Sequence, residues 1–200
     1  MMEIVLASNN KNKLSEISHI LWKSGIKVLS LADIGFNREI EETGETLSEN
    51  ALIKARAVRA KAKGRLVIAD DTGLEVDYLA KAPGVYSARF AGPECSFVDN
   101  NRKLLKLLKG VRTPDRGAIF RTVVAVIYND GTEEVYEGRV PGSISLSEKG
   151  KMGFGYDPVF YPENSNKTYA QMTPEEKNSL SHRKKAVINA VKGIRKRLKV

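Results

Sequence analysis

Four apolar residues, Leu66–Ala69, run directly into two neighbouring aspartates, Asp70 and Asp71, and then into a glycine, Gly73. The apolar run predicts a short buried strand that ends at a glycine turn. Two adjacent like charges repel each other and are costly to desolvate, so a cation or a proton must compensate them. Acids at the end of such a strand are suited to present a divalent ion to a phosphate, whereas a solvated turn is the alternative interpretation.

The region before this run alternates between strand and helix patterns. The predicted strands are Glu3–Ala7, Lys27–Leu31 and Leu66–Ala69, and the predicted helices are Lys11–Lys23 and Thr46–Lys63. In the second helix, apolar residues recur at helical spacing until Gly64 ends it. Alternation of strand and helix predicts a partly parallel sheet with right-handed crossovers.

The remainder of the chain is richer in antiparallel signals. We expect a helix over Val98–Lys109, a strand over Gly117–Tyr128, a hairpin turn at Asn129-Asp130-Gly131, a strand over Glu133–Val140 and a further one at Ile144–Leu146. Thr173 and Glu176 form a capping box that starts a helical turn, and a final helix presents Val187, Ala190, Val191, Ile194 and Leu198 on one face. The predicted fold class is therefore α/β, with a mixed central sheet flanked by helices. We expect one domain over residues 1–200, in two lobes with a central cleft.

The net charge of +9 comes from the end of the chain, because residues from Lys177 onward include nine lysines and arginines and no acids. Such a block favours a polyanion, either nucleic acid or a small polyphosphate. The apolar period of the final helix indicates that one face packs on the body, which favours the polyphosphate. No apolar stretch approaches the roughly 20 residues that a membrane span needs. Cys95 is the only cysteine, which argues for a reducing, cytoplasmic setting.

Two segments have the composition of phosphate and metal sites. Ser8–Lys13 joins the first strand to the first helix with small polar side chains and two lysines, which suits a phosphate at a helix start, although it lacks the G-K-[ST] of a Walker A loop. A capped helix start with solvated lysines is the alternative. Glu39, Glu41, Glu42 and Glu45 crowd the start of the next helix. They either favour the helix dipole or supply one or two carboxylates that join Asp70 and Asp71 around Mg²⁺.

Two later segments are typical of base recognition. Gly153–Pro158 places aromatic rings between and after glycines, and such a ring can stack on a base, although Phe154 also suits a core position. Lys177–Arg183 gathers Lys, Ser, His and Arg donors that can read a nucleobase edge or a phosphate, against a default of exposed or capping residues.

Together and in this order, these segments resemble the inosine triphosphate pyrophosphatase family, the dITP/XTP pyrophosphatases that clear non-standard purine nucleotides. The resemblance extends from about Ile4 to Arg183. It is carried by Ser8–Lys13, Glu41–Glu45, Ala69–Leu74, Pro83–Arg89, Phe154–Pro158 and Lys177–Arg183. It implies an elongated mixed α/β fold with a central cleft and a homodimer.

The resemblance also implies roles for residues at the matching positions. Asp71 is the expected catalytic base, with Asp70 as the alternative, and Glu41 and Asp71 are the expected Mg²⁺ ligands. The expected substrate-binding residues are Ser8, Asn9, Asn10, Lys11, Asn12, Lys13, Thr72, Phe154, Gly155, Tyr156, Asp157, Lys177, Ser181, His182 and Arg183. Members often carry glycine where this chain has Asn9, and asparagine tolerates the left-handed backbone better than most residues.

The expected activity is Mg²⁺-dependent hydrolysis of ITP, dITP and XTP to the monophosphate and pyrophosphate, by a cytoplasmic enzyme that binds neither nucleic acid nor membrane. Two alternatives stay open at this point. One is a related pyrophosphatase that acts on other modified nucleotides. The other is a nucleic-acid-binding module that uses the basic C-terminal helix.

Overall fold

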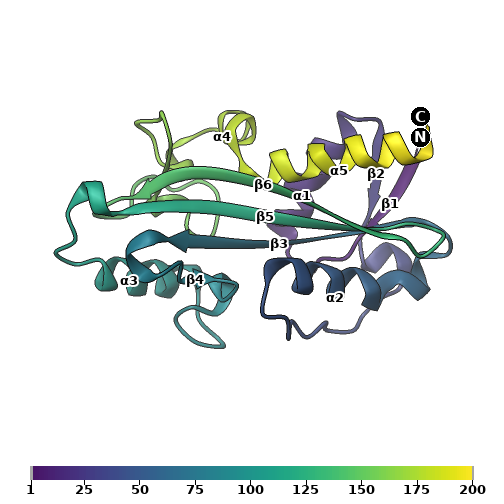
Figure 1. Ribbon diagram of the computed structural model, residues 1–200, viewed down its shortest axis with the longest axis horizontal. Coiled ribbons are helices and arrows are strands. Elements are labelled where there is room, and N and C mark those ends of the chain that lie inside the picture. Colours follow the sequence, from purple (N-terminus) through teal and green to yellow (C-terminus); the bar gives the residue numbers. More distant parts are fainter. Residues whose placement is uncertain (1, 200) are drawn as a thin grey trace. The chain divides into compact units, whose positions relative to one another are not determined.

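The fold is known from a computed structural model that describes residues 2–199. The strands of this region form one sheet: β1 (Met2–Leu6), β2 (Ile26–Leu29), β3 (Leu66–Val76), β4 (Pro83–Gly84), β5 (Gly117–Ile127), β6 (Glu133–Ile144) and β7 (Phe160–Pro162). Their order is β2-β1-β3-β5-β6-β7, with β4 paired to β3 (Figure 1). β1 pairs in parallel with β2 and β3, whereas β4 and β7 pair antiparallel with β3 and β6. The predicted mixed α/β sheet is confirmed.

The helices match the predicted segments to within a few residues at each end. They are α1 (Lys11–Trp22), α2 (Leu47–Arg59), α3 (Phe97–Leu107), α4 (Pro174–Leu180) and α5 (His182–Leu198). The capping box between Thr173 and Glu176 is present at the start of α4, as predicted. One predicted core residue is wrong, because Leu198 near the end of α5 is exposed. Within residues 2–199, no helix is both long and apolar enough to cross a membrane.

The chain divides into two compact units. The first consists of Met1–Asp71, Thr122–Gly138 and Arg183–Val200, and the second of Thr72–Arg121 and Arg139–His182. Two pairs of neighbouring residues are divided between the units: Asp71 with Thr72, and His182 with Arg183. The segments predicted to carry chemistry are therefore distributed over both units.

The first unit has its sheet residues covered on both faces. Ile4, Leu6 and Ile68 pack in one cluster with residues of α1 and α5, including Ile17 and Val187. Because successive strand residues point to opposite faces, the buried residues between these positions point the other way. α2 lies on that opposite side (Figure 1). This alternation decides which helix each residue of β3 faces.

The strand predicted to end at Ala69 instead continues to Val76, so the expected glycine turn is wrong. Gly73 is a buried strand residue, and Leu74 and Val76 resume the buried apolar pattern beyond the aspartates. The aspartates were expected at the end of the strand, next to the glycine turn. They do not stop the strand, because each aspartate meets a lysine of its own, at distances given below.

The second unit has an aromatic core around Phe120, Phe160 and Tyr169. A further strand was expected at Ile144–Leu146, but Ile144 is the last residue of β6 and the next two residues lie outside any strand. The buried Arg116 explains where β6 ends. Its guanidinium donates to the carbonyls of Leu108, Ile144 and Ser145 at 2.7, 2.8 and 2.6 Å, so the chain is held there by a side chain.

Candidate active site

The segment Ser8–Lys13 lies between the end of β1 and the first turn of α1. Asn10 is the N-cap of α1, and its side-chain oxygen accepts from the backbone N–H groups of Asn12 and Lys13 at 3.0 and 3.2 Å. The Asn10 N–H in turn donates to Ser8 Oγ at 3.3 Å. Asn9 is not among the described residues with positive φ, so this loop has no left-handed residue at that position. The polar side chains thus fix the loop at the positive end of a helix.

Asp70 lies at the centre of a buried cluster of charges on the α1 and α5 side of β3. Lys13 Nζ is 3.1 Å from Asp70 Oδ2, and Arg183 Nε donates to the same oxygen at 3.3 Å. Arg183 also donates to Glu16 on α1. Burial alone would raise the pKa of Asp70, but Lys13 and Arg183 outweigh it and hold the pKa far below its usual range. Asp70 is therefore a fixed negative charge that ties α1 and α5 to the sheet.

The cations around Asp70 respond to burial in different ways. Burial lowers the pKa of Lys13, and the attraction of Asp70 only partly offsets this. Burial also opposes the charge of Arg183, but Asp70 and Glu16 outweigh it and raise the pKa of the guanidinium. Arg183 was expected in the pocket for the nucleobase, together with Lys177 and His182. In the structure it pairs with Asp70 and Glu16 and belongs to the first unit, whereas Lys177 and His182 belong to the second.

Asp71 points to the opposite side of β3 from Asp70 and meets a different lysine. Lys54 of α2 lies 2.8 Å from Asp71 Oδ1 and 2.8 Å from a carboxylate oxygen of Glu42. Burial raises the pKa of Asp71 although Lys54 opposes the shift. Burial disfavours the charged Lys54, but Asp71 and Glu42 outweigh it and raise the lysine's pKa. Asp71 Oδ2 is buried and has no hydrogen-bond partner among the described residues.

The glutamates before α2 are not equivalent. Glu42 is half-buried and reaches Asp71 through Lys54, whereas Glu41, the predicted metal ligand, is exposed. Within residues 2–199, no group of three or more His, Cys, Asp or Glu side chains is arranged to hold a metal. Glu42 belongs to the acidic group that the sequence identified. Lys54 was missed, because a lysine inside a regular helix carries no signal of its own in the sequence.

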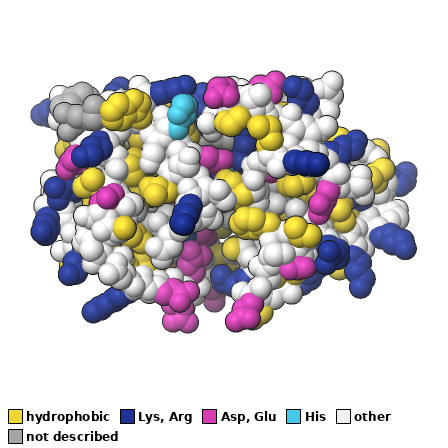
Figure 2. All heavy atoms as spheres, turned by 180° about the vertical axis from the view of Figure 1, so that it is seen from behind, with side chains coloured by type: hydrophobic (Ala, Val, Ile, Leu, Met, Phe, Trp, Pro, Cys, Tyr) yellow, Lys and Arg dark blue, Asp and Glu magenta, His cyan; other side chains and the backbone are white. Residues whose placement is uncertain are grey.

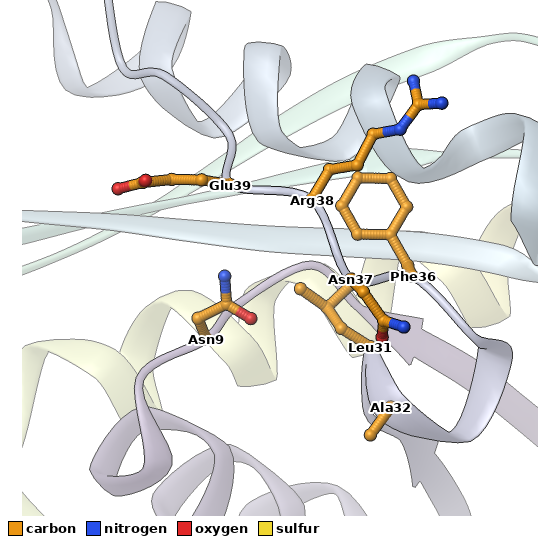
Figure 3. A pocket seen from close by; sticks show the side chains of 7 residues that line it. All are labelled: Asn9, Leu31, Ala32, Phe36, Asn37, Arg38 and Glu39. Atoms are coloured by element: carbon orange, nitrogen blue, oxygen red, sulfur yellow. The ribbon is translucent and has the colours of Figure 1, made fainter.

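A pocket of about 440 Å³ lies beside Asn9, a residue of the predicted phosphate-binding loop. Its other lining residues come from the segment that follows β2: Leu31, Ala32, Phe36, Asn37, Arg38 and Glu39 (Figure 3). In the close view the Arg38 side chain extends away from Asn9, beside the Phe36 ring (Figure 3). The hollow therefore adjoins the loop that was predicted to bind phosphate, and its walls are mixed polar and apolar.

In the second unit, the loop Gly153–Asp157 is organised by the carboxylate of Asp157. One oxygen of Asp157 accepts from the Phe154 N–H at 2.8 Å and from Lys177 Nζ at 2.6 Å. Lys177 Nζ also lies 4.7 Å from the centre of the Phe154 ring, a cation–π contact. Both Asp157 and Lys177 are buried. The structure thus brings together the aromatic segment and the donor segment that the sequence identified separately.

Further contacts fix this loop from two neighbouring segments. The Tyr156 hydroxyl donates to the Ser87 carbonyl at 2.9 Å, and Asn101 Nδ2 of α3 donates to the Gly155 carbonyl at 3.1 Å. Ser87 lies within the Pro83–Arg89 segment that the resemblance includes. Asn101 was missed, because a polar residue on a helix is ordinarily exposed and only the tertiary structure shows that it is buried.

His182 lies flat against an aromatic ring of the core. Its imidazole stacks on Phe120 with ring centres 4.4 Å apart and an angle of 13° between the planes. His182 is buried, as is Ser181, the last cap residue of α4. Thr72 lies half-buried on β3. These residues belong to the same unit as Phe154 and Lys177, so the second unit contains every predicted base-pocket residue except Arg183.

The two glycines of the loop differ in a way that mutation can test. Both have positive φ, +75° at Gly153 and +63° at Gly155, but a Cβ at Gly153 would overlap Asp157 Oδ2 whereas a Cβ at Gly155 would meet nothing within 4 Å. We expect Gly155→Ala to cost about 1 kcal/mol through backbone strain, and Gly153→Ala to cost about 2 kcal/mol because it also displaces Asp157. Urea unfolding of both variants measures the difference. Equal losses would mean that Asp157 tolerates displacement.

Comparison with known proteins identifies relatives over nearly the whole chain. The sequence pattern of the Ham1 family matches residues 4–192. A dITP/XTP pyrophosphatase of Thermoanaerobacter sp. (strain X514) is 49% identical over 197 residues, which cover 98% of each chain. A dITP/XTP pyrophosphatase of Bacillus subtilis (strain 168) is 46% identical over 187 residues, with 94% of each chain covered.

Solved structures give the same result for the fold. The Staphylococcus aureus Ham1 protein matches with a TM-score of 0.83 at 41% identity, covering 97% of this chain and 98% of that one. A HAM1 protein from Coxiella burnetii matches with a TM-score of 0.86 at 38% identity, covering 98% of this chain and 100% of that one.

Proposed function

Because this chain belongs to the Ham1 family, we propose that it is a nucleoside triphosphate pyrophosphatase that hydrolyses dITP, XTP and ITP to the monophosphate and pyrophosphate. The observation that supports this most directly is the unequal environment of the two aspartates. Asp70 is held by two cations that keep its pKa far below its usual range, whereas burial raises the pKa of Asp71, which pairs with Lys54. Asp71 Oδ2 is buried and has no hydrogen-bond partner among the described residues. A carboxylate that is raised in pKa and has a free oxygen suits a general base.

In the proposed reaction, the oxygen of a water molecule bonds to the α-phosphorus. The bond between that phosphorus and the oxygen bridging to the β-phosphorus breaks, and pyrophosphate leaves as one unit. Asp71 accepts the proton of the attacking water. Lys54 and Glu42 keep the Asp71 side chain in place, since Lys54 contacts both carboxylates at 2.8 Å. Holding the base rigidly reduces the entropic part of the barrier.

The polyphosphate is assigned to the segment Ser8–Lys13 and to the positive end of α1. Asn10 fixes the first turn of the helix, and Lys13 supplies charge beside Asp70. Helix starts of this kind bind anions through backbone N–H groups and the dipole. The pocket beside Asn9 leaves one side of the loop open, so that a phosphate chain can reach the loop from the pocket (Figure 3).

We propose Mg²⁺ as the cofactor, with Glu41 and Asp71 as its protein ligands. The buried, unpartnered Asp71 Oδ2 fits this role, because a hard cation prefers carboxylate oxygen and needs few protein ligands when phosphates and water supply the others. When bound, the ion would neutralise charge on the phosphates. The half-buried Glu42 is the neighbouring carboxylate that already reaches Asp71, through Lys54.

The purine is assigned to the second unit, with Phe154 as the stacking surface and Lys177 and His182 as donors. Hypoxanthine and xanthine carry an acceptor oxygen at C6, whereas adenine carries an amino donor there. A site of buried donors leaves groups unpaired when adenine binds, and unpaired buried groups are strongly disfavoured. The fixed plane of His182 on Phe120 limits the directions in which its ring nitrogens can point.

The setting is proposed to be the cytoplasm, and the assembly a homodimer. A role in nucleic-acid binding receives less support. The apolar face of α5 is buried in the first unit, and Arg197 pairs with Asp130. On the face drawn in Figure 2, lysine and arginine side chains are scattered and do not gather into one patch. Nucleic acid binding would show as a salt-sensitive gel shift.

The function is tested by pyrophosphate release. With Mg²⁺ present, purified protein is expected to release pyrophosphate from ITP, dITP and XTP at least about tenfold faster than from ATP, because of the donor mismatch at C6. Enzymatic detection of pyrophosphate, with orthophosphate measured in parallel, gives the rates. Equal rates on all four nucleotides, or orthophosphate as first product, would contradict the proposal. A panel that includes modified pyrimidine and methylated nucleotides tests the related-pyrophosphatase alternative.

A further inference from the structure

The first helical residue of α3 is an aromatic residue that touches the proposed base loop. Phe97 is 43% exposed, and its ring centre lies 6.0 Å from that of Phe154 with an angle of 44° between the planes. We call Phe97 and Phe154 the aromatic pair. A single exposed phenylalanine needs no explanation. This one is notable because its one ring–ring contact in the described region is with the residue assigned to base stacking.

The position of Phe97 is fixed by the helix that carries it. Ser96 and Asp99 form a capping box at the start of α3, in which Ser96 Oγ accepts from the Asp99 N–H at 3.2 Å. One turn later, Asn101 Nδ2 donates to the carbonyl of Gly155, next to Phe154. The helix is thus joined to the loop at two points, the ring contact and the amide hydrogen bond. Phe97 is held beside Phe154 by structure that is independent of its own ring.

The surroundings of Phe154 leave Phe97 as the accessible member of the pair. Lys177 Nζ lies over the Phe154 ring, so that ring is partly covered by a cation. With centres 6.0 Å apart and a tilt of 44°, the two rings already touch and leave no room for a base between them. Phe97 adjoins the Phe154 ring, so a base that stacks on Phe154 has the exposed Phe97 ring as a neighbouring aromatic surface.

We propose that Phe97 is a purine-binding residue, whose exposed ring extends the stacking surface of Phe154 and contacts the edge of the bound base. This inference rests on the proposed function, which assigns Phe154 to the base. Stacking and edge contacts with an aromatic ring do not read donors and acceptors. Phe97 is therefore expected to raise the affinity for purine nucleotides in general without contributing to the preference for a C6 oxygen.

The test is the variant Phe97→Ala, measured by steady-state kinetics and by calorimetric titration with the product IMP. We expect KM for ITP and Kd for IMP to rise about fivefold, toward the lower end of what loss of base–aromatic stacking costs, with kcat unchanged. KM for XTP should rise by the same factor. Phe97→Trp keeps an aromatic surface and is expected to retain wild-type values within about twofold.

Leu107→Ala is the matched control, because Leu107 lies at the other end of α3 and is similarly exposed, at 47%. It is expected to leave KM, kcat and IMP binding unchanged. Phe154→Ala tests the proposed base site separately from the proposed role of Phe97. Weakened IMP binding in Phe154→Ala with wild-type binding in Phe97→Ala would overturn the inference and leave the proposed base site standing. Unchanged IMP binding in both variants would overturn both. A lower kcat without a change in IMP affinity would make Phe97 a loop support and would also overturn the inference.

Discussion

Asp71→Asn is expected to reduce kcat for ITP by at least about 10³-fold while the protein stays folded. The substitution keeps the shape of the side chain and removes its ability to accept the proton of the attacking water, a contribution of about 10²–10⁴ in rate for a general base. Loss of a proposed Mg²⁺ ligand adds to the effect. Little stability should be lost, because Lys54 keeps its contact with Glu42. Pyrophosphate release and urea unfolding measure the two expectations separately.

The direction of the pKa shift supports the expected stability of this variant. Burial raises the pKa of Asp71, which means that the folded state disfavours its charged form relative to the unfolded chain. A neutral asparagine removes that penalty. Residual activity within about tenfold of wild type would place the base elsewhere. A large loss of stability would mean that the ion pair with Lys54 matters more than the burial of the carboxylate.

Asp70→Asn is expected to destabilise the fold by about 3–5 kcal/mol, the cost of removing one partner from a buried group of charges. Asp70 is the carboxylate that Lys13 and Arg183 share, and Arg183 also pairs with a second acid, Glu16. The loss should appear as a lower urea midpoint with an unchanged slope, because the surface exposed on unfolding is the same. The same chemical change at neighbouring residues is thus expected to remove activity in one case and stability in the other.

A conservative exchange at the partner checks the assignment. Glu16→Gln removes the second acid that Arg183 contacts and leaves Asp70 in place, so it should cost less than Asp70→Asn, on the order of 1–3 kcal/mol. If Asp70→Asn unfolds at the wild-type urea concentration, then the cluster contributes nothing to stability. That outcome would also contradict the depressed pKa of Asp70, because a carboxyl whose pKa is lower in the folded protein than in the unfolded chain stabilises the fold at neutral pH.

The sequence was sufficient for the elements that depend on local signals. Apolar spacing placed α1, α2 and α3, and the capping box at Thr173 placed α4, because these signals lie within a few residues of each other. The error at β3 has a different origin. Whether Asp70 and Asp71 end a strand depends on cations from other elements, and the positions of Lys13, Lys54 and Arg183 in space are not encoded near the aspartates.

The candidate site shows the same division. The loop Ser8–Lys13 and the segment Gly153–Asp157 were identified from composition, because glycine, asparagine and aromatic residues carry local meaning. Residues that act through tertiary contacts were not: Lys54 reaches Asp71 across 17 positions of sequence, and Asn101 reaches Gly155 across 54. Helical residues such as these give no local sign that they are buried.

The alternation of side chains along β3 has a consequence for how this chain tolerates change. Neighbouring residues of β3 face different helices. Substitutions in α1 or α5 are therefore expected to change the stability of the fold, whereas substitutions in α2 are expected to change the chemistry at Asp71. Insertion or deletion of a single residue earlier in β3 would turn every later side chain to the opposite face of the sheet, and so toward the other set of helices. β3 should consequently tolerate substitutions far better than changes in its length. Natural variants are expected to differ here by replacement of residues and not by insertion.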